Sequence, residues 1–131
     1  MTDLSAFEFK QDTLTVNIKH PGTGDVLTNE DGTPMTIEVW LPHTAVAKAV
    51  DYEYTDKYLA AMDKGKKRTA EQLDKQRLER LAKVTKAWNI TLDKKKPDLS
   101  VEAATGVYGR LVWLYRQVVE EVEEAVSFTK D

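Results

Sequence analysis

The residues that could coordinate a metal ion or act as nucleophiles are few and scattered. His20 and His43 are the only imidazoles among 131 residues, and there is no cysteine. The two histidines flank a predicted β-hairpin and could approach each other, but a metal site needs two more ligands at matched spacing, and none recurs. We therefore interpret both as surface histidines at strand ends. The lack of cysteine excludes disulfides, thiolate metal sites and cysteine nucleophiles.

Carboxylates are more numerous, and two acidic segments contain enough of them to suggest calcium binding or acid–base catalysis. Residues 23–32, TGDVLTNEDG, lack the alternating oxygen ligands and final glutamate of a calcium-binding loop, so we read a turn. Residues 120–124, EEVEE, could supply a catalytic pair, but acid–base catalysis needs a desolvated carboxyl group, and helical spacing puts these opposite an apolar stripe. They remain candidates for binding a basic partner: Glu120, Glu121, Glu123 and Glu124.

No motif for nucleophilic catalysis or for phosphate or dinucleotide binding occurs in the chain. The sequence therefore predicts a protein that is not an enzyme and that carries no metal and no cofactor.

Two short basic clusters, KGKKR at 64–68 and KKKP at 94–97, could contact phosphates or acidic proteins. Neither contains the interleaved aromatic residues that stack on bases, so we consider nucleic-acid binding the weaker alternative. The candidate partner-binding residues here are Lys64, Lys66, Lys67, Arg68, Lys94, Lys95 and Lys96. Trp40 alternates out of register with its apolar neighbours, which makes it a further candidate contact on an exposed sheet face.

The elements that must position these residues begin with strands. Alternating apolar residues predict strands over 14–20 and 35–41, and 26–28 is a possible short one, with turns between them. An isolated hairpin is marginally stable in water, so this one must pack on helices.

Helical spacing follows from residue 44 onward. Thr44 can cap a helix that runs to about Asp63, with Val46, Ala49, Val50, Tyr54, Tyr58, Ala61 and Met62 at helical spacing. Thr69 and Gln72 form a capping box for a second helix, whose inner stripe is Leu78, Leu81, Thr85 and Trp88. Residues 89–97 are expected to form an irregular loop between the second and third helices.

Ser100 caps a third, short helix. Two glycines predict a break near 108–110, because glycine costs about 1 kcal/mol relative to alanine in a helix. The last helix places its apolar residues inside: Leu111, Leu114, Tyr115, Val118, Val122, Ala125 and Val126.

Together these elements predict an α+β fold, a small N-terminal antiparallel β-hairpin or meander packed on a bundle of three to four α-helices. We expect a single domain over 1–131, with a β-hairpin region at 1–42 that includes a flexible N-terminal lead-in, and a helical region at 43–131.

Charge is segregated along the chain behind a net charge of −3. Residues 1–42 carry 7 acidic and 2 basic side chains, residues 43–99 carry 9 and 14, and residues 100–131 carry 6 and 3. A dedicated nucleic-acid binder would be basic overall or on one dominant face. The pattern instead favours contacts between the ends and the middle, within the fold or between copies.

Hydrophobic residues make up 41% of the chain and charged residues 31%, an ordinary soluble composition. No apolar run approaches the roughly 20 residues of a membrane span, and the first residues do not form a signal peptide, so we expect a cytoplasmic protein without membrane contact.

Four passages resemble the small tail assembly chaperones and tail-completion proteins of long-tailed bacteriophages. Residues 16–42 resemble the family's opening hairpin, with His20 where an aspartate is common, and Pro42 to Val50 resembles its helix entry. Residues 87–100 resemble W-x-x-I-x-L-D-G-x-P-x-x-F-S, matching at Trp88, Leu92, Asp93, Pro97 and Ser100, with Lys94 replacing the glycine and Leu99 the phenylalanine.

The fourth passage, residues 102–122, resembles E-N-A-x-x-L-Y-x-x-x-P-W-I-R-x-Q-V. It matches at Glu102, Ala104, Tyr108, Trp113, Gln117 and Val118. Val112 stands where the family has the proline that enforces a break between the last two helices. The resemblance covers roughly residues 14–128.

The resemblance implies a non-enzymatic chaperone that binds the tape measure protein, a long helical chain prone to aggregation, until tail tube subunits polymerise around it. It further implies action in the host bacterial cytoplasm and absence from the mature virion, with the tail tube protein as a second partner. Separately, the segregated charge leads us to expect that copies of the chain associate with one another. The alternatives are a minor tail or head–tail connector subunit retained in the virion, and a small nucleic-acid-binding regulator.

Overall fold

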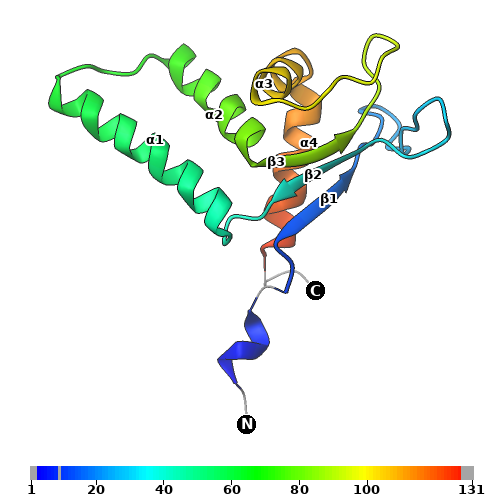
Figure 1. Cartoon of the computed structure of the whole chain (residues 1–131), viewed down its shortest axis with the longest axis horizontal. Coiled ribbons are helices and arrows are strands. Elements are labelled where there is room, and N and C mark those ends of the chain that lie inside the picture. The colour runs from blue at the N-terminus through cyan, green and yellow to red at the C-terminus, as the bar shows by residue number, and fades with distance from the viewer. Residues whose placement is uncertain (1–2, 9, 128–131) are drawn as a thin grey trace.

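The computed structural model describes residues 3–8 and 10–127 and has the α+β architecture that the sequence predicts (Figure 1). A three-stranded antiparallel sheet is combined with four α-helices, and a short 3₁₀ helix, η1, precedes them. The elements are η1 Leu4–Phe7, β1 Thr13–Asn17, β2 Thr36–Trp40, α1 Ala45–Asp63, α2 Ala70–Val84, β3 Thr85–Asn89, α3 Val101–Arg110 and α4 Val112–Ala125.

The sheet has the order β1-β2-β3, so the predicted hairpin supplies two of its three strands. Val16 pairs with Ile37, and Ile37 pairs with Trp88, which sets one row of the apolar face. Leu114 and Val118 of α4 belong to the same buried cluster, and Figure 1 shows α4 crossing behind the strands. Because side chains alternate across each strand, the opposite face of the sheet carries mostly polar residues, such as Thr36 and Glu38, together with Trp40.

The third strand corrects the prediction for the second helix, which ends at Val84 instead of continuing through Trp88. Thr85 pairs with Val39 of β2, with a register shift between Glu38 and Val39. Pairing with β2 overrides the helical spacing, since β-branched and aromatic residues fit a half-buried sheet well. The sheet thus combines strands from 1–42 with one from the segment expected to be helical, and both regions share one core.

Helix α1 begins after Thr44, whose hydroxyl accepts a hydrogen bond from the N–H of Ala47, and it ends at Asp63, as predicted. Only its first half packs on the body, because Ala47 and Val50 are buried while nearly every residue after Tyr54 is exposed. In Figure 1, α1 and α2 diverge toward the loop that joins them. Four residues of the predicted apolar stripe are exposed: Val46, Ala49, Tyr58 and Met62.

The break between α3 and α4 lies at Leu111, one residue past the predicted segment. Leu111 has φ −116° and ψ 77°, and the N–H of Leu111 still donates to the carbonyl of Val107. The chain therefore makes this break without a proline at position 112. Along α4, Leu114 and Val118 are buried as expected, whereas Ala125 is exposed because the helix extends past the core.

Lys94 provides a test of backbone strain in the turn at 92–95. Asp93 and Lys94 have φ values of 52° and 63°, and Leu92 and Lys95 form an antiparallel bridge, which is the geometry of a tight hairpin turn. The left-handed conformation costs a non-glycine residue about 1–2 kcal/mol. We expect Lys94→Gly to raise the unfolding free energy by up to about 1 kcal/mol, measured by urea denaturation.

The matched control is Lys95→Gly, one residue along, where φ is not positive. That substitution should lower stability, because glycine there only adds freedom to the unfolded chain. Equal effects of the two substitutions would contradict a turn that requires positive φ at Lys94.

Candidate partner-binding surfaces

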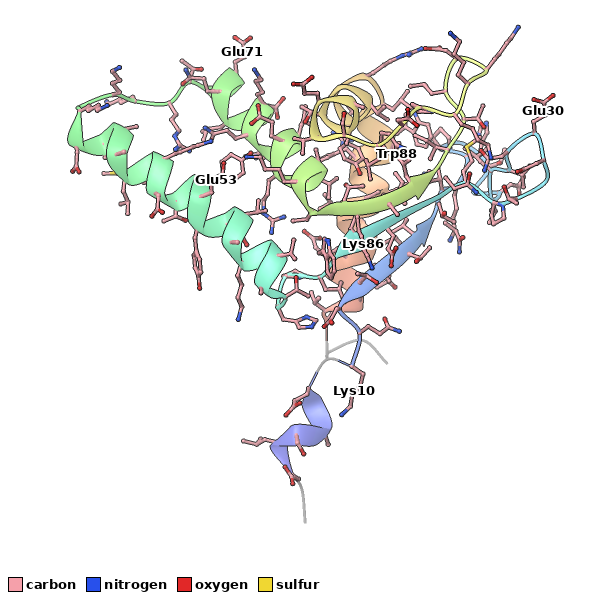
Figure 2. All side chains as sticks on the ribbon, viewed as in Figure 1. Lys10, Glu30, Glu53, Glu71, Lys86 and Trp88 are labelled. Atoms are coloured by element: carbon pink, nitrogen blue, oxygen red, sulfur yellow. The ribbon has the colours of Figure 1, made fainter. Side chains whose placement is uncertain are left out.

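A polar ladder joins α1 to α2 in place of a continuous apolar contact. Arg80 Nε donates to Asp51 Oδ1 at 2.5 Å, and Lys83 Nζ donates to Glu53 Oε1 at 2.7 Å. Figure 2 shows Glu53 projecting from α1 toward α2. The hydrogen bond from Lys83 lowers the pKa of Glu53, and the same bond raises the pKa of Lys83. These contacts hold the helices side by side and keep a groove open between them.

The groove has a volume of about 390 Å³ and a strongly basic lining. Three of the predicted residues, Lys66, Lys67 and Arg68, line it from the loop, whereas Lys64 does not. Two further lysines join them, Lys57 from α1 and Lys75 from α2. Lys57 and Lys75 are not among the partner-binding residues predicted from the sequence. Two signals could have indicated them, since each lies one or two helical turns from the loop and both contribute to the positive charge of residues 43–99.

Arg68 makes two side-chain contacts within this groove. Its Nη1 donates to Gln76 Oε1 at 2.6 Å, and its guanidinium carbon lies 5.2 Å from the centroid of the Tyr58 ring. Aromatic stacking of a guanidinium fixes its plane. Arg68 therefore closes one wall of the groove, and the exposed Lys66 and Lys67 remain at its mouth.

The outward side of α1 is unexpectedly apolar. Five of the ten exposed large apolar residues in the described part of the chain lie on this helix: Val46, Tyr52, Tyr58, Leu59 and Met62. Tyr52 is 65% exposed and Leu59 is 53% exposed. At 100° per residue, these two lie almost in line along the helix and opposite the buried Val50. We call Tyr52, Leu59 and Met62 the outer face of α1; Tyr58 is left out because the guanidinium of Arg68 covers its ring on the groove side.

The predicted glutamates lie together on α4. Glu120, Glu123 and Glu124 are exposed, and Glu121 is half-buried. Glu120 and Glu121 line a second groove, of about 430 Å³, with Gln117 and the turn at 19–24. The Gln117 side chain exchanges two hydrogen bonds with the backbone of Lys19, at 3.0 and 2.6 Å, and so fixes α4 against the end of β1.

The second basic cluster lies away from the first. In Figure 1 the turn at 93–96 is at one end of the molecule and the α1–α2 loop is at the other, so the structure does not join the two clusters into one basic surface. Lys96 Nζ contacts Asp31 Oδ2 and Asn89 Oδ1, both at 3.3 Å. Hydrogen bonds from Thr33, with a smaller contribution from Lys96, lower the pKa of Asp31 to about 2. Lys96 is thus partly neutralised, while Lys94 and Lys95 are exposed at the turn.

Trp40 lies on the sheet face opposite Val39, as predicted, but it is half-buried. Lys86 Nζ lies 4.8 Å from the centroid of its ring, and Figure 2 shows Lys86 beside this face of the sheet. A cation over the ring covers part of it, so Trp40 is a smaller contact surface than the outer face of α1.

The strand register corrects the expectation that the two histidines could meet. His20 follows the Asn17 end of β1, and His43 follows the Trp40 end of β2, so they lie at opposite ends of the hairpin. His20 Nδ1 accepts hydrogen bonds from the N–H groups of Gly22 and Thr23, and His43 Nε2 lies 3.6 Å from Asp12 Oδ1. Within the described residues, no group of three metal-ligating side chains converges.

The sequence matches no protein-family model, and no curated protein or solved structure is significantly similar to it. None of the helices in the described part of the chain combines the length and the apolar character needed to cross a membrane.

Proposed function

We propose that this chain is a non-enzymatic assembly chaperone of a phage tail, which binds the helical tape measure protein through the outer face of α1. The observation that carries the proposal is the exposure of Tyr52, Leu59 and Met62 on a helix that projects from the body. Soluble monomers expose apolar side chains singly as a rule, whereas a gathered set favours a partner.

The geometry of this face suits a helical partner. Tyr52 and Leu59 are two turns apart and Met62 follows by one turn, so the face forms a stripe along α1. An amphipathic helix can lay its own apolar stripe along such a face. Tyrosine and methionine suit a surface that must accept many similar segments, because their side chains present large or adaptable apolar area.

The residues that carry the family resemblance also connect separate elements. Trp88 Nε1 donates to the carbonyl of Pro97 at 2.9 Å, and Asp93 receives two hydrogen bonds from Arg110, at 2.7 and 2.8 Å. The Ser100 hydroxyl accepts from the N–H of Ala103 and caps α3. These contacts give the pattern a structural reason, which supports the resemblance as a basis for the proposal.

The test is co-expression with the tape measure protein encoded by the same phage genome. The intact chain should raise the soluble fraction of that protein and co-purify with it. Tyr52→Ser combined with Leu59→Ser should reduce co-purification roughly tenfold, since exposed apolar anchors carry much of such an interface. Stability should change by less than about 0.5 kcal/mol, because both side chains are on the surface.

The matched control is Leu4→Ser with Val112→Ser, which removes two exposed apolar side chains elsewhere. This control should retain binding. If the tape measure protein remains insoluble beside the intact chain, or if both variants lose binding equally, the proposed function or its assigned face is wrong.

The proposal also places the chain in the host cytoplasm and outside the finished particle. Mass spectrometry of purified virions should detect tube and tape measure proteins and miss this chain. Its stoichiometric presence in particles would instead favour a minor tail or connector subunit.

A further inference from the structure

The basic groove carries more positive charge than its own surroundings neutralise. Five cations line it, and Glu79 is its one acidic lining residue. Lys75 is paired with Glu79 at 4.0 Å, and Lys57 with Glu53 at 3.2 Å. Among the described residues, no ion pair joins Lys66 or Lys67 to an acid. The mouth of the groove therefore presents two uncompensated lysines beside Arg68.

The complementary surface lies on the same chain but in a different place. Glu120, Glu123 and Glu124 occupy positions i, i+3 and i+4 of α4, so they share one face of the helix. Glu120 and Glu123 are exposed and take part in no ion pair within the described residues. We call Glu120, Glu123 and Glu124 the acidic stripe.

The two surfaces do not meet within one molecule. No residue of α4 lines the groove. Figure 1 shows α4 behind the sheet, while the α1–α2 loop that supplies Lys66 and Lys67 is at the far end of the helical arm. A contact between stripe and groove therefore requires two copies of the chain.

We propose that copies of this chain associate head to tail, with the acidic stripe of one copy seated at the basic groove of the next. The apolar parts of Tyr54 and Ala61 form part of the groove wall, so a helix can rest there with its glutamates against the lysines. In this arrangement each copy uses its stripe toward one neighbour and its groove toward another, so the interface is heterologous and can add further copies. It leaves the outer face of α1 free, so a row of copies can present that face repeatedly.

Sedimentation velocity on the isolated chain tests this association and requires no other protein, so its outcome is independent of the proposed chaperone function. At about 50 mM salt the chain should form species larger than a monomer. At about 500 mM salt it should be monomeric, because charges are screened over about 8–10 Å already at physiological salt. An unchanged monomer at both salt concentrations overturns the proposal.

Charge-reversal variants identify the surfaces. Glu120→Lys with Glu123→Lys, and separately Lys66→Glu with Lys67→Glu, should each weaken self-association at least about tenfold, since like charges replace opposite ones. The controls reverse the same number of charges elsewhere, at Glu8 and Glu30 for the acidic pair and at Lys10 and Lys94 for the basic pair. Controls that weaken association equally would show a general effect of net charge and would overturn the proposal.

Mixing the two variants gives the sharpest result. One variant has the basic groove and a basic stripe, and the other has an acidic groove mouth and the acidic stripe. Both kinds of stripe-to-groove contact between the two variants are attractive, so an equimolar mixture should regain salt-sensitive association. A mixture that associates no more strongly than either variant alone would show that the contact does not join stripe to groove, and would overturn the proposal. Combining all four reversals in one chain should restore salt-sensitive association.

A nucleic acid is the competing occupant of a basic groove. Three results together would show that the groove binds phosphates, and the proposal would then fail. A labelled DNA duplex would bind at about 100 mM salt, and Lys66→Glu with Lys67→Glu would abolish that binding. Glu120→Lys with Glu123→Lys would leave self-association unchanged.

Discussion

Replacing Tyr108 with alanine should lower the unfolding free energy by about 3–5 kcal/mol, the usual cost of removing a large buried aromatic side chain. Tyr108 is 0% exposed and sits where α2, α3 and α4 meet the sheet. Its ring also makes an edge contact with Tyr115, with centroids 6.3 Å apart. Since small domains have a total stability of about 5–15 kcal/mol, this single change should leave a marginal fold.

The hydroxyl of Tyr108 has a specific partner, which makes a second variant informative. It lies 2.7 Å from Thr85 Oγ1, and the Thr85 hydroxyl donates its one proton to the carbonyl of Leu81 at 2.8 Å. Tyr108 must therefore be the donor in this pair. Burial raises the pKa of Tyr108 to about 12, so the phenol keeps its proton well above neutral pH.

Tyr108→Phe should then cost only about 1 kcal/mol, because Thr85 keeps its bond to Leu81. Thr85→Val should cost more, about 1–3 kcal/mol, because it leaves the Tyr108 hydroxyl buried without an acceptor. Urea denaturation at neutral pH measures all three changes. Equal effects of Tyr108→Phe and Tyr108→Ala would show that the ring contributes little, contrary to its burial.

The parts of the fold that the sequence predicts are those with local signals. Thr44, Thr69 and Ser100 each cap a helix as predicted, and the Thr69–Gln72 capping box is complete. Alternation predicted the pairing of β1 and β2. Strand β3 could not be predicted in this way, because Thr85 and Trp88 also continue the helical spacing of Leu78 and Leu81, and only the partner strand β2 decides between the two.

The candidate surfaces also divide into features with a local sequence signal and features that depend on contacts distant in sequence. Position along the chain was enough to predict that Lys66, Lys67 and Arg68 form one basic cluster, although Lys64 does not line the groove. It also predicted the exposure of Glu120, Glu123 and Glu124, whereas Glu121 is half-buried. The exposure of the apolar residues of α1 depends on the length over which α2 packs beside α1. The polar ladder formed by Arg80–Asp51 and Lys83–Glu53 spaces the two helices, as does a hydrogen bond from the Tyr54 hydroxyl to Glu79 Oε2 at 3.3 Å. Such long-range pairs have no signal in a single sequence.

Trp113→Ala should produce the second large loss of stability, about 3 kcal/mol, at the lower end of the range for aromatic truncation because the side chain is only partly buried. The sequence places Trp113 directly after the break between the last two helices, where it is expected to act as a structural anchor. In the structure it packs against the core beside a small cavity of about 130 Å³. The cavity lining combines the hairpin, the segment after β3 and both C-terminal helices: Ile18, Leu27, Met35, Ile90, Thr91, Leu92, Val107, Leu111, Trp113 and Leu114.

This position makes Trp113 a link between four segments that are distant in sequence. Removing its indole enlarges the existing cavity, and its neighbours cannot collapse into the space without moving β-strand or helix backbone. Trp113→Phe should recover more than half of the lost stability, because a second aromatic ring refills most of the volume. A role in partner binding would give a different result, with weaker co-purification of the tape measure protein and an unchanged melting temperature. Thermal melts of both variants distinguish the two roles, and an unchanged melt for Trp113→Ala would move this residue from the core to the interaction surface.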